Sequence, residues 1–329
     1  MTQSAITVRS NDDAGRWLPL HADISASPPT QKAFSTDAAY DILAFAIESK
    51  EAGLQVALCT LVDIRGGSSR ALGAHMAVAD DGRYCGYVSG GCTEAAIAAE
   101  ALETIRSGHD RFFMLGEGSR VFDIVFPCGG GITVAIHIVK DIEPLRSIIS
   151  LVDSRRSAWL RYVPRHEQLS VTTERCRTGW DGDAFVTCYR PSVRVILSGH
   201  TLEVETAASV AKAAGYDVIF FDDAASLPPD RALIDPHSAV ALLQHDLDRE
   251  IPVLEAALAA SPFYIGALGS SRTHQKRVEQ LLQGGHSAEV IARIKAPIGI
   301  FAGARDAQSL ALSVIADIAA TRQSLSTHN

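Results

Sequence analysis

Apolar residues in the second half of the chain fall into short continuous runs. Each run has the length of a buried strand, at 193–197, 217–221, 239–243 and 263–268. Helix-forming stretches separate these runs, and the first of them, Leu202 to Ala214, is stopped by Gly215. Strands that alternate with helices in this way predict a parallel sheet with helices packed on it.

The first half combines helices with a hairpin. A predicted helix runs from a cap at Asp37 to Gly53 and leads into a strand at 56–62. Two further apolar runs, at 75–79 and 83–88, flank the turn Asp80-Asp81-Gly82 and predict a hairpin. The hairpin leads directly into a loop that contains a glycine pair and a cysteine.

A strongly helical run follows that loop from Thr93 onward. Ile97, Ala101 and Ile105 share one face of the predicted helix, and Gly108 is placed to end it. A further strand is predicted at 132–139, after a second loop with glycines and one cysteine.

These patterns predict an α/β protein, with an N-terminal mixed α/β domain with glycine–cysteine loops and then a Rossmann-like parallel-sheet domain. The expected boundaries are a flexible N-terminal arm at 1–36, the first domain at 37–140, a connecting segment with a small hairpin at 141–190, and the Rossmann-like domain at 191–329. The closing helix, from Ala307 to Arg322, is expected to pack on the core or to form a dimer surface.

Composition excludes several classes of protein. The 329 residues are 47% hydrophobic and 21% charged, as in an ordinary soluble globular protein, and no membrane span is expected. A net charge of −8 provides no basic stripe for nucleic acid. The six cysteines lack the spacing of a disulfide framework and the start lacks a secretory segment, so a reducing cytoplasm is expected.

Cys92 is the leading candidate for chemistry. It ends the stretch Ser89-Gly90-Gly91-Cys92 and precedes the predicted helix, whose free N–H groups and dipole favour a thiolate, the nucleophilic and metal-binding form. The glycine pair lets the loop present bare amides to a ligand. The alternative is that Cys92 is a small buried hydrophobic residue.

A second loop, Cys128-Gly129-Gly130-Gly131, joins two apolar runs. The two loops could meet over a pocket for an anionic, sulfur-loving ligand, although the spacing of their cysteines is not that of a zinc site. A third loop, at 63–70, combines two glycines, two hydroxyls and two guanidinium groups, including Arg70. It is either an oxyanion site or a solvated turn.

The second half carries part of a dinucleotide-binding pattern. Gly199 and His200 lie at the first turn, and Asp222 is placed for a ribose hydroxyl. However, Leu197 replaces the first glycine of the fingerprint, and Glu203 and Glu205 put negative charge where a pyrophosphate would bind. NAD(P) is therefore the second candidate cofactor, and these three residues argue against it. Further along, Gly266 in a strand and Ser270 with Arg272 at a helix start are the other candidate cofactor-binding residues.

Several of these motifs together resemble the XdhC/CoxI family of accessory proteins for molybdenum hydroxylases such as xanthine dehydrogenase and carbon monoxide dehydrogenase. The resemblance covers about 37–322 and rests on the segments Arg65 to Arg70, Ser89 to Glu94, Cys128 to Gly130, His245-Asp246, Pro252 to Leu254, Tyr264 to His274 and Ile294 to Gly299. The chain departs from the family pattern at Gly67, where a serine is usual, and at Ser69, where a proline is usual.

The resemblance implies a function and partners. It implies that the protein binds molybdenum cofactor (molybdopterin), assists its sulfuration and hands it to an apo molybdenum hydroxylase, as a maturation chaperone rather than a catalyst. Cys92 and Cys128 would contact the metal centre, while loop amides and Arg70 would hold the pterin phosphate. A cysteine desulfurase is a possible further partner and a homodimer is expected. The alternatives are an NAD(P)-dependent oxidoreductase and a scaffold without cofactor.

Overall fold

The computed structural model describes residues 28–116, 130–199, 201–221, 231–244, 246–301 and 303–328. The chain divides into two compact units, residues 1–140 and 141–329. Each unit is described by itself.

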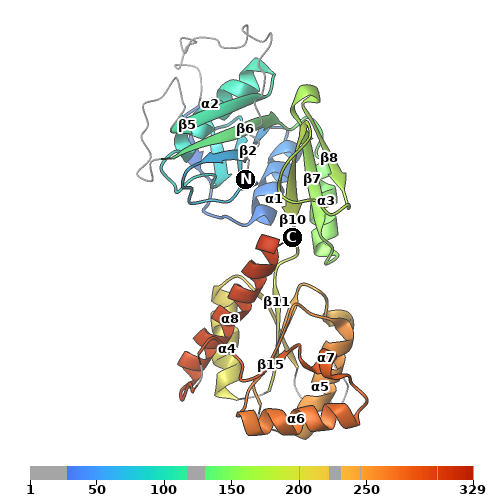
Figure 1. Cartoon of the computed structure of the whole chain (residues 1–329). Coiled ribbons are helices and arrows are strands. Elements are labelled where there is room, and N and C mark those ends of the chain that lie inside the picture. The colour runs from blue at the N-terminus through green and yellow to red at the C-terminus, as the bar shows by residue number, and fades with distance from the viewer. Residues whose placement is uncertain are drawn as a thin grey trace. The chain divides into compact units, whose positions relative to one another are not determined.

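The first unit is built on one six-stranded sheet (Figure 1). Its strand order is β1-β4-β3-β2-β6-β5, and every neighbouring pair is antiparallel except β1 and β4. Its elements are β1 (Gln31–Lys32), α1 (Ala39–Glu51), β2 (Val56–Arg65), β3 (His75–Ala79), β4 (Arg83–Gly86), α2 (Glu94–Ser107), β5 (Arg111–Gly116) and β6 (Gly131–Ile138). The predicted hairpin, the helix after Cys92 and the strand after the second loop are all confirmed.

Helix α2 covers the sheet with the face that the sequence predicts. Ile97 and Ala101 are fully buried in one cluster with alternate residues of β2, namely Ala57, Cys59 and Leu61. The helix ends at Gly108, whose φ of 75° is left-handed and therefore favours glycine. The packing of α2 fixes the direction in which the preceding loop enters the helix.

The start of helix α1 differs from the expectation. The helix begins at Ala39, and Thr36 accepts a hydrogen bond from the backbone N–H of Ala38 at 3.1 Å. The prediction that Asp37 caps this helix is wrong, because its carboxylate forms an ion pair with Arg70 at 2.7 Å instead. This ion pair ties the start of α1 to one of the candidate loops.

The second unit begins with helix α3 (Glu143–Asp153), which packs on a four-stranded antiparallel sheet. The sheet has the order β8-β7-β10-β9 and consists of β7 (Ala158–Val163), β8 (Gln168–Thr172), β9 (Gly179–Asp181) and β10 (Ala184–Tyr189), with a 3-10 turn η2 (Pro164–His166) between β7 and β8. The sequence predicts only a small hairpin here. The central pair, β7 and β10, joins residues such as Trp159 and Cys188 that are distant along the chain, so no local pattern reveals it.

A five-stranded parallel sheet forms the rest of the second unit and confirms the predicted Rossmann-like architecture. Its order is β12-β11-β13-β14-β15. The elements are β11 (Arg194–Ser198), α4 (Leu202–Ala213), β12 (Asp217–Phe221), the 3-10 turn η4 (Arg231–Leu233), β13 (Ser238–Leu242), α5 (Leu247–Ala260), β14 (Tyr264–Ala267), α6 (Ser271–Gln283), α7 (Ala288–Ile291), β15 (Ile294–Lys295) and α8 (Ala307–His328).

Successive residues of the central strand point into two different cores. Val195 and Leu197 pack with α4 and α8, whereas Ile196 packs with α5. Figure 1 shows α4 and α8 on one side of the strands and α5, α6 and α7 on the other. A strand buried on both faces must be apolar at every position, which explains the continuous runs in the sequence.

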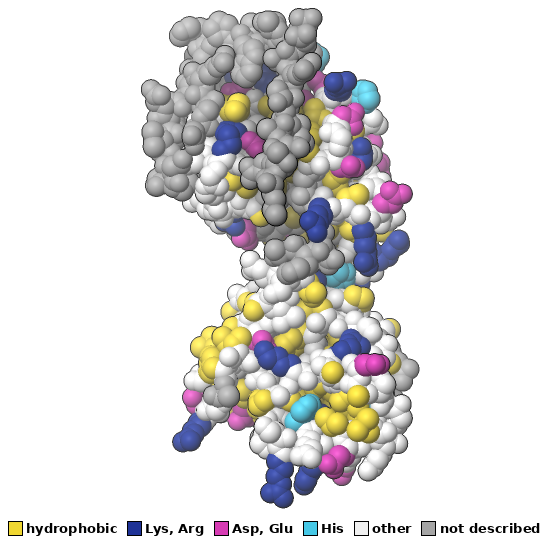
Figure 2. All heavy atoms as spheres, in the orientation of Figure 1, with side chains coloured by type: hydrophobic (Ala, Val, Ile, Leu, Met, Phe, Trp, Pro, Cys, Tyr) yellow, Lys and Arg dark blue, Asp and Glu magenta, His cyan; other side chains and the backbone are white. Residues whose placement is uncertain are grey.

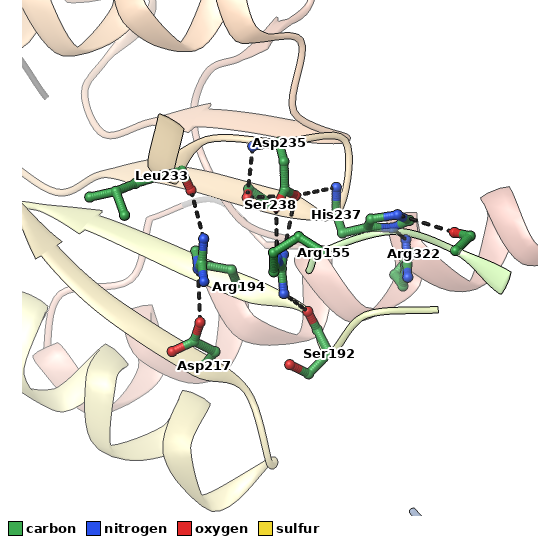
Figure 3. Close-up of polar contacts among 10 residues, drawn as sticks. Arg155, Ser192, Arg194, Asp217, Leu233, Asp235, His237, Ser238 and Arg322 are labelled. Atoms are coloured by element: carbon green, nitrogen blue, oxygen red, sulfur yellow. Dashed lines mark hydrogen bonds and ion pairs between the residues drawn. The ribbon is translucent and has the colours of Figure 1, made fainter. Parts of the chain in front are cut away.

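A polar network joins the antiparallel and parallel parts of the second unit (Figure 3). Arg155 donates to both carboxylate oxygens of Asp235, at 2.7 and 3.1 Å, and to the carbonyl oxygen of Ser192. Burial, reinforced by the positive charge of Arg322, lowers the pKa of His237 to about 4. The neutral imidazole therefore accepts from Arg322 at Nδ1, at 3.3 Å. The network anchors β13 and α8 to the turn after α3.

We predict that the first unit loses stability in acid through His75. Its imidazole is 3% exposed in β3 and lies 3.0 Å from the hydroxyl of Thr60, and burial lowers its pKa from 6.5 to about 4. The unfolded chain therefore takes up a proton before the folded one does as the pH falls. The loss should begin near pH 6.5 and approach about 3 kcal/mol near pH 4.

Urea unfolding as a function of pH measures this effect. The His75→Asn variant should show a shallower decline of the unfolding free energy than the wild type, whereas His166→Asn, at an exposed position, should keep the wild-type slope. Equal slopes for wild type and His75→Asn would contradict the assignment.

Candidate functional site

The loop before helix α2 is built around the carboxylate of Glu94. This first residue of the helix is only 1% exposed, and its side chain turns back onto the loop. One carboxylate oxygen accepts from the backbone N–H of Ser89 at 2.9 Å and the other from the N–H of Thr93 at 3.2 Å. The hydroxyl of Ser89 lies 2.9 Å from both oxygens and accepts from Thr93 Oγ1 at 2.8 Å. A buried charge held by several donors fixes both ends of the loop.

This arrangement leaves Cys92 at the surface. Gly91 has a φ of 103°, a conformation that residues with a side chain rarely adopt, so the chain reverses here and the next residue is exposed. Among the cysteines that the structure describes, Cys59 and Cys85 are buried, and burial raises the pKa of both thiols, that of Cys85 to about 12. The alternative that Cys92 is a buried hydrophobic residue is therefore wrong.

The loop at 66–70 lies against the Cys92 loop and against the start of β6. A Cβ at Gly130 would be 2.4 Å from the carbonyl oxygen of Arg65 and 2.8 Å from that of Gly67, so only glycine fits there. A Cβ at Gly90 would be 3.3 Å from the hydroxyl of Ser69. The structure thus brings three of the predicted glycine segments together. Cys128 and Gly129 lie outside the described residues, so a meeting of the two thiols stays a prediction.

Two cations and an aromatic ring border the Cys92 loop. The ring of Tyr87 carries Lys32 Nζ at 4.8 Å and the guanidinium of Arg70 at 5.4 Å from its centroid. Lys32 also donates to the Tyr87 hydroxyl at 3.0 Å, and this bond raises the pKa of Lys32 and lowers that of Tyr87. A Cβ at Gly91 would lie 3.9 Å from the ring. Because Asp37 pairs with Arg70 at 2.7 Å, the positive charge that an anionic ligand could meet beside this ring comes mainly from Lys32.

Lys32 and Tyr87 are not among the residues predicted from the sequence. Lys32 lies within the predicted flexible arm, but β1 pairs with β4 and places the lysine beside the ring. No local pattern marks a two-residue strand whose partner lies about fifty residues further along the chain. Tyr87 could be predicted from the sequence, because it lies directly before the Cys92 loop.

The residues predicted to bind a nucleotide lie in the second unit. Gly199 follows β11 with a φ of 124°, and a Cβ there would be 3.1 Å from a methyl group of Val204. Leu197 is fully buried, and Glu203 and Glu205 occupy the first turn of α4. His200 and Asp222, as well as His245, lie outside the described residues.

Two of the remaining candidates, Gly266 and Ser270, have structural roles. A Cβ at Gly266 in β14 would be 2.6 Å from Ile298, so this glycine makes room for a core side chain. Ser270 is the N-cap of α6 and accepts from the backbone N–H of Thr273 at 3.3 Å, while Arg272 is exposed in the first turn. Within the described residues, no group of three His, Cys, Asp or Glu side chains is arranged to hold a metal ion. No described helix is both long and apolar enough to cross a membrane.

Comparisons with known proteins match both units. A model of the XdhC and CoxI family matches residues 49–116, which include the Glu94 loop, and a model of the XdhC Rossmann domain matches residues 195–318. The molybdenum cofactor insertion chaperone PaoD of Escherichia coli K12 is 50% identical over 89% of this chain and 91% of its own length. The chain belongs to the XdhC and CoxI family. The resemblance seen in the sequence is confirmed.

More distant relatives share the same layout. A probable subunit of xanthine dehydrogenase from Bacillus subtilis is 23% identical over 82% of this chain and 94% of its own length. A crystal structure described as a xanthine dehydrogenase from Bacillus halodurans superposes with a TM-score of 0.66 at 19% identity, covering 86% of this chain and 96% of that one. At this sequence identity, the superposition supports a shared fold and nothing more.

We predict that the Glu94 carboxylate is required for an ordered loop. In Glu94→Gln an amide N–H₂ replaces one acceptor oxygen and faces the donors of Ser89 and Thr93, so the unfolding free energy should fall by about 1–3 kcal/mol. Hydrogen exchange at the amides of Ser89 and Thr93 should become faster in the folded protein. Glu103→Gln, which removes a partly exposed ion pair with Arg106, should change neither measurement. Unchanged protection of both amides in Glu94→Gln would show that other contacts hold the loop.

Proposed function

We propose that this chain binds the molybdenum cofactor as its cargo, assists its sulfuration and inserts it into an apo molybdenum hydroxylase of the xanthine dehydrogenase type. The observation that carries the proposal is the exposed thiol of Cys92 on a loop that a buried carboxylate holds in one shape. The name of the similar PaoD, a molybdenum cofactor insertion chaperone, supports the same function.

The residues around Cys92 fit the chemistry of this cargo. A cysteine sulfur is a soft ligand that suits a molybdenum–sulfur centre. Lys32 and Arg70 beside it suit the phosphate of the pterin, and glycine amides in the same loop add neutral donors. Cys128 would add a second sulfur if its loop returns to the same side. The site therefore offers a sulfur for the molybdenum end of the cofactor and cations for its phosphate end, which suits binding and transfer.

The partners and location are part of the proposal. A molybdenum hydroxylase is the client, a cysteine desulfurase is a possible sulfur source, and the cytoplasm is the expected compartment. The free cysteines among the described residues suit a reducing compartment. Figure 2 shows Lys and Arg side chains interspersed with Asp and Glu on the face in view, which together with the net charge of −8 argues against nucleic acid as a partner.

An NAD(P)-dependent oxidoreductase remains the alternative to this function. Its support is the parallel sheet with Gly199 at the first turn. Against it, Glu203 and Glu205 place two carboxylates in the first turn of α4, where a pyrophosphate would need positive charge. A calorimetric titration with NAD and NADP separates the two functions, because a dehydrogenase binds its cofactor in the micromolar range.

We predict that Cys92→Ser abolishes cofactor delivery and leaves the fold intact. The hydroxyl keeps the size of the side chain but removes the soft ligand, so the variant should purify without pterin and molybdenum and fail to activate the apo hydroxylase. Its unfolding free energy should stay within about 0.5 kcal/mol of the wild type, because the side chain is exposed. Cys176→Ser and Cys188→Ser serve as matched controls and should retain delivery.

Alkylation of the native protein provides an independent measurement. Iodoacetamide labelling, read by peptide mass spectrometry, should modify Cys92 well before the buried Cys59 and Cys85. Cys92 should also be modified faster than Cys128 at neutral pH. If Cys92→Ser delivers the cofactor as well as the wild type does, no sulfur ligand is needed and the protein acts as a scaffold. That result would contradict the proposal.

The expected homodimer is also a proposal, and an apolar surface on the second unit supports it. Ile300, Phe301 and Leu312 are 55%, 47% and 58% exposed, and they lie together because the backbone N–H of Phe301 donates to Ser313 in α8. Large apolar groups gathered on a surface favour association. Leu312→Glu should therefore produce monomers in light scattering. Leu282→Glu, at a similarly exposed leucine on α6, should stay dimeric. A monomeric wild type at micromolar concentration would contradict the proposal.

A further inference from the structure

A cleft lined mainly by polar and charged residues lies at the carboxyl ends of the parallel strands in the second unit. It has a volume of about 860 Å³ and is lined at the exits of β11 and β13 by Thr201 and Gln244, and on α6 by Lys276 and Gln280. The chain leaves β11 toward α4 on one face of the sheet and β13 toward α5 on the other face. Ligands of α/β proteins bind at such a switch point. The volume is within the range of small-molecule sites.

Three buried side-chain atoms in this cleft have no hydrogen-bond partner among the described residues. They are Oγ1 of Thr201, Oε1 of Gln244 and Oε1 of Gln280. Gln244 is only 5% exposed, and its Nε2 donates to Ser198 at 3.1 Å, which leaves its oxygen free to accept. A buried polar atom that stays unpaired destabilises the fold, so such atoms are rare. Their gathering in one cleft indicates a ligand that supplies N–H or O–H donors.

The charges around the cleft disfavour a pyrophosphate. Asp246, Asp248 and Glu279 line it against Arg249 and Lys276, which gives a net charge of −1. Thr201 is the N-cap of α4, whose first turn adds two more glutamates. A doubly charged anion would be repelled here, whereas a neutral ligand would not.

A buried ion pair holds the helices of the cleft in place. Arg277 on α6 is fully buried and donates to both carboxylate oxygens of Glu250 on α5, at 2.5 and 3.1 Å, and to the carbonyl oxygen of Leu268. Gln280 follows Arg277 by one turn of the same helix. Its position relative to α5 is therefore fixed before any ligand binds.

We propose that this cleft binds a nucleoside through its hydroxyl and amino groups, without a phosphate. The two carboxamide oxygens accept from ribose hydroxyls or from an exocyclic amine, and the Thr201 hydroxyl completes the set. The inference does not depend on the proposed cofactor transfer, since every residue that it uses lies in the second unit.

Saturation-transfer NMR on the full chain tests the proposal with adenosine, guanosine, cytidine and uridine, each compared with its 5′-monophosphate and with NAD. At least one nucleoside should bind, and more tightly than its monophosphate. Gln280→Met and Thr201→Val keep the shape of the side chains but remove an acceptor, so each should weaken binding about five- to tenfold. Gln168→Met, on the exposed side of β8, should bind as the wild type does.

The unfolding free energy of the same variants distinguishes a binding role from a structural one. Without ligand, Gln280→Met should be at least as stable as the wild type, because it removes an unpaired buried oxygen. A loss of stability in both variants would show that these atoms support the fold. Absence of binding for all four nucleosides at millimolar concentration, equal affinity in Gln280→Met, or tighter binding of the monophosphates would each overturn the proposal.

Discussion

The shape of the Cys92 loop depends on how one buried carboxylate is satisfied. The Glu94 side chain is almost completely buried, and a buried charge is stable only where hydrogen-bond donors surround it. The nearest donors are the backbone and hydroxyl groups of Ser89 and Thr93, so the loop must fold over the carboxylate. This requirement sets the reversal at Gly91 and leaves the next side chain at the surface. Cys92 is therefore exposed on a loop whose shape the buried Glu94 carboxylate holds.

The sheets determine which loops meet. In the first unit, β2 pairs with β6 up to Arg65 and Gly131, and this register delivers the loop at 66–70 to the start of β6. The carbonyl groups of that loop fill the space that a side chain at Gly130 would need. In the second unit, the chain leaves β11 for α4 on one face of the sheet and leaves β13 for α5 on the other face, so a cleft opens at this switch point. In both candidate sites, the pairing and order of the strands therefore set how far apart the loops lie.

Local patterns in the sequence predict much of this fold. The hairpin at β3 and β4, the buried face of α2 and the parallel sheet all follow from periodicity and turn residues. The antiparallel sheet of β7 to β10 and the contact of Lys32 with Tyr87 do not, because each joins segments that are distant along the chain. Glu94 is visible in the sequence only as a charge in a first turn, a position where glutamate is usually exposed. Asp37 has the sequence of a cap, but its carboxylate pairs with Arg70, and α1 begins without a side-chain cap.

The two units present different chemistry to a ligand. The first offers a sulfur, two cations and glycine amides, a combination suited to a ligand that is soft at one end and anionic at the other. The second keeps the sheet of a dinucleotide-binding domain, but carboxylates stand in its first helical turn and neutral acceptors line its cleft. Two carboxylates in the first turn of α4 disfavour a phosphate there, whereas the unpaired oxygens suit a ligand with uncharged donors. An assignment of NAD(P) from the fold alone would therefore overlook the two carboxylates at the position where the pyrophosphate would bind.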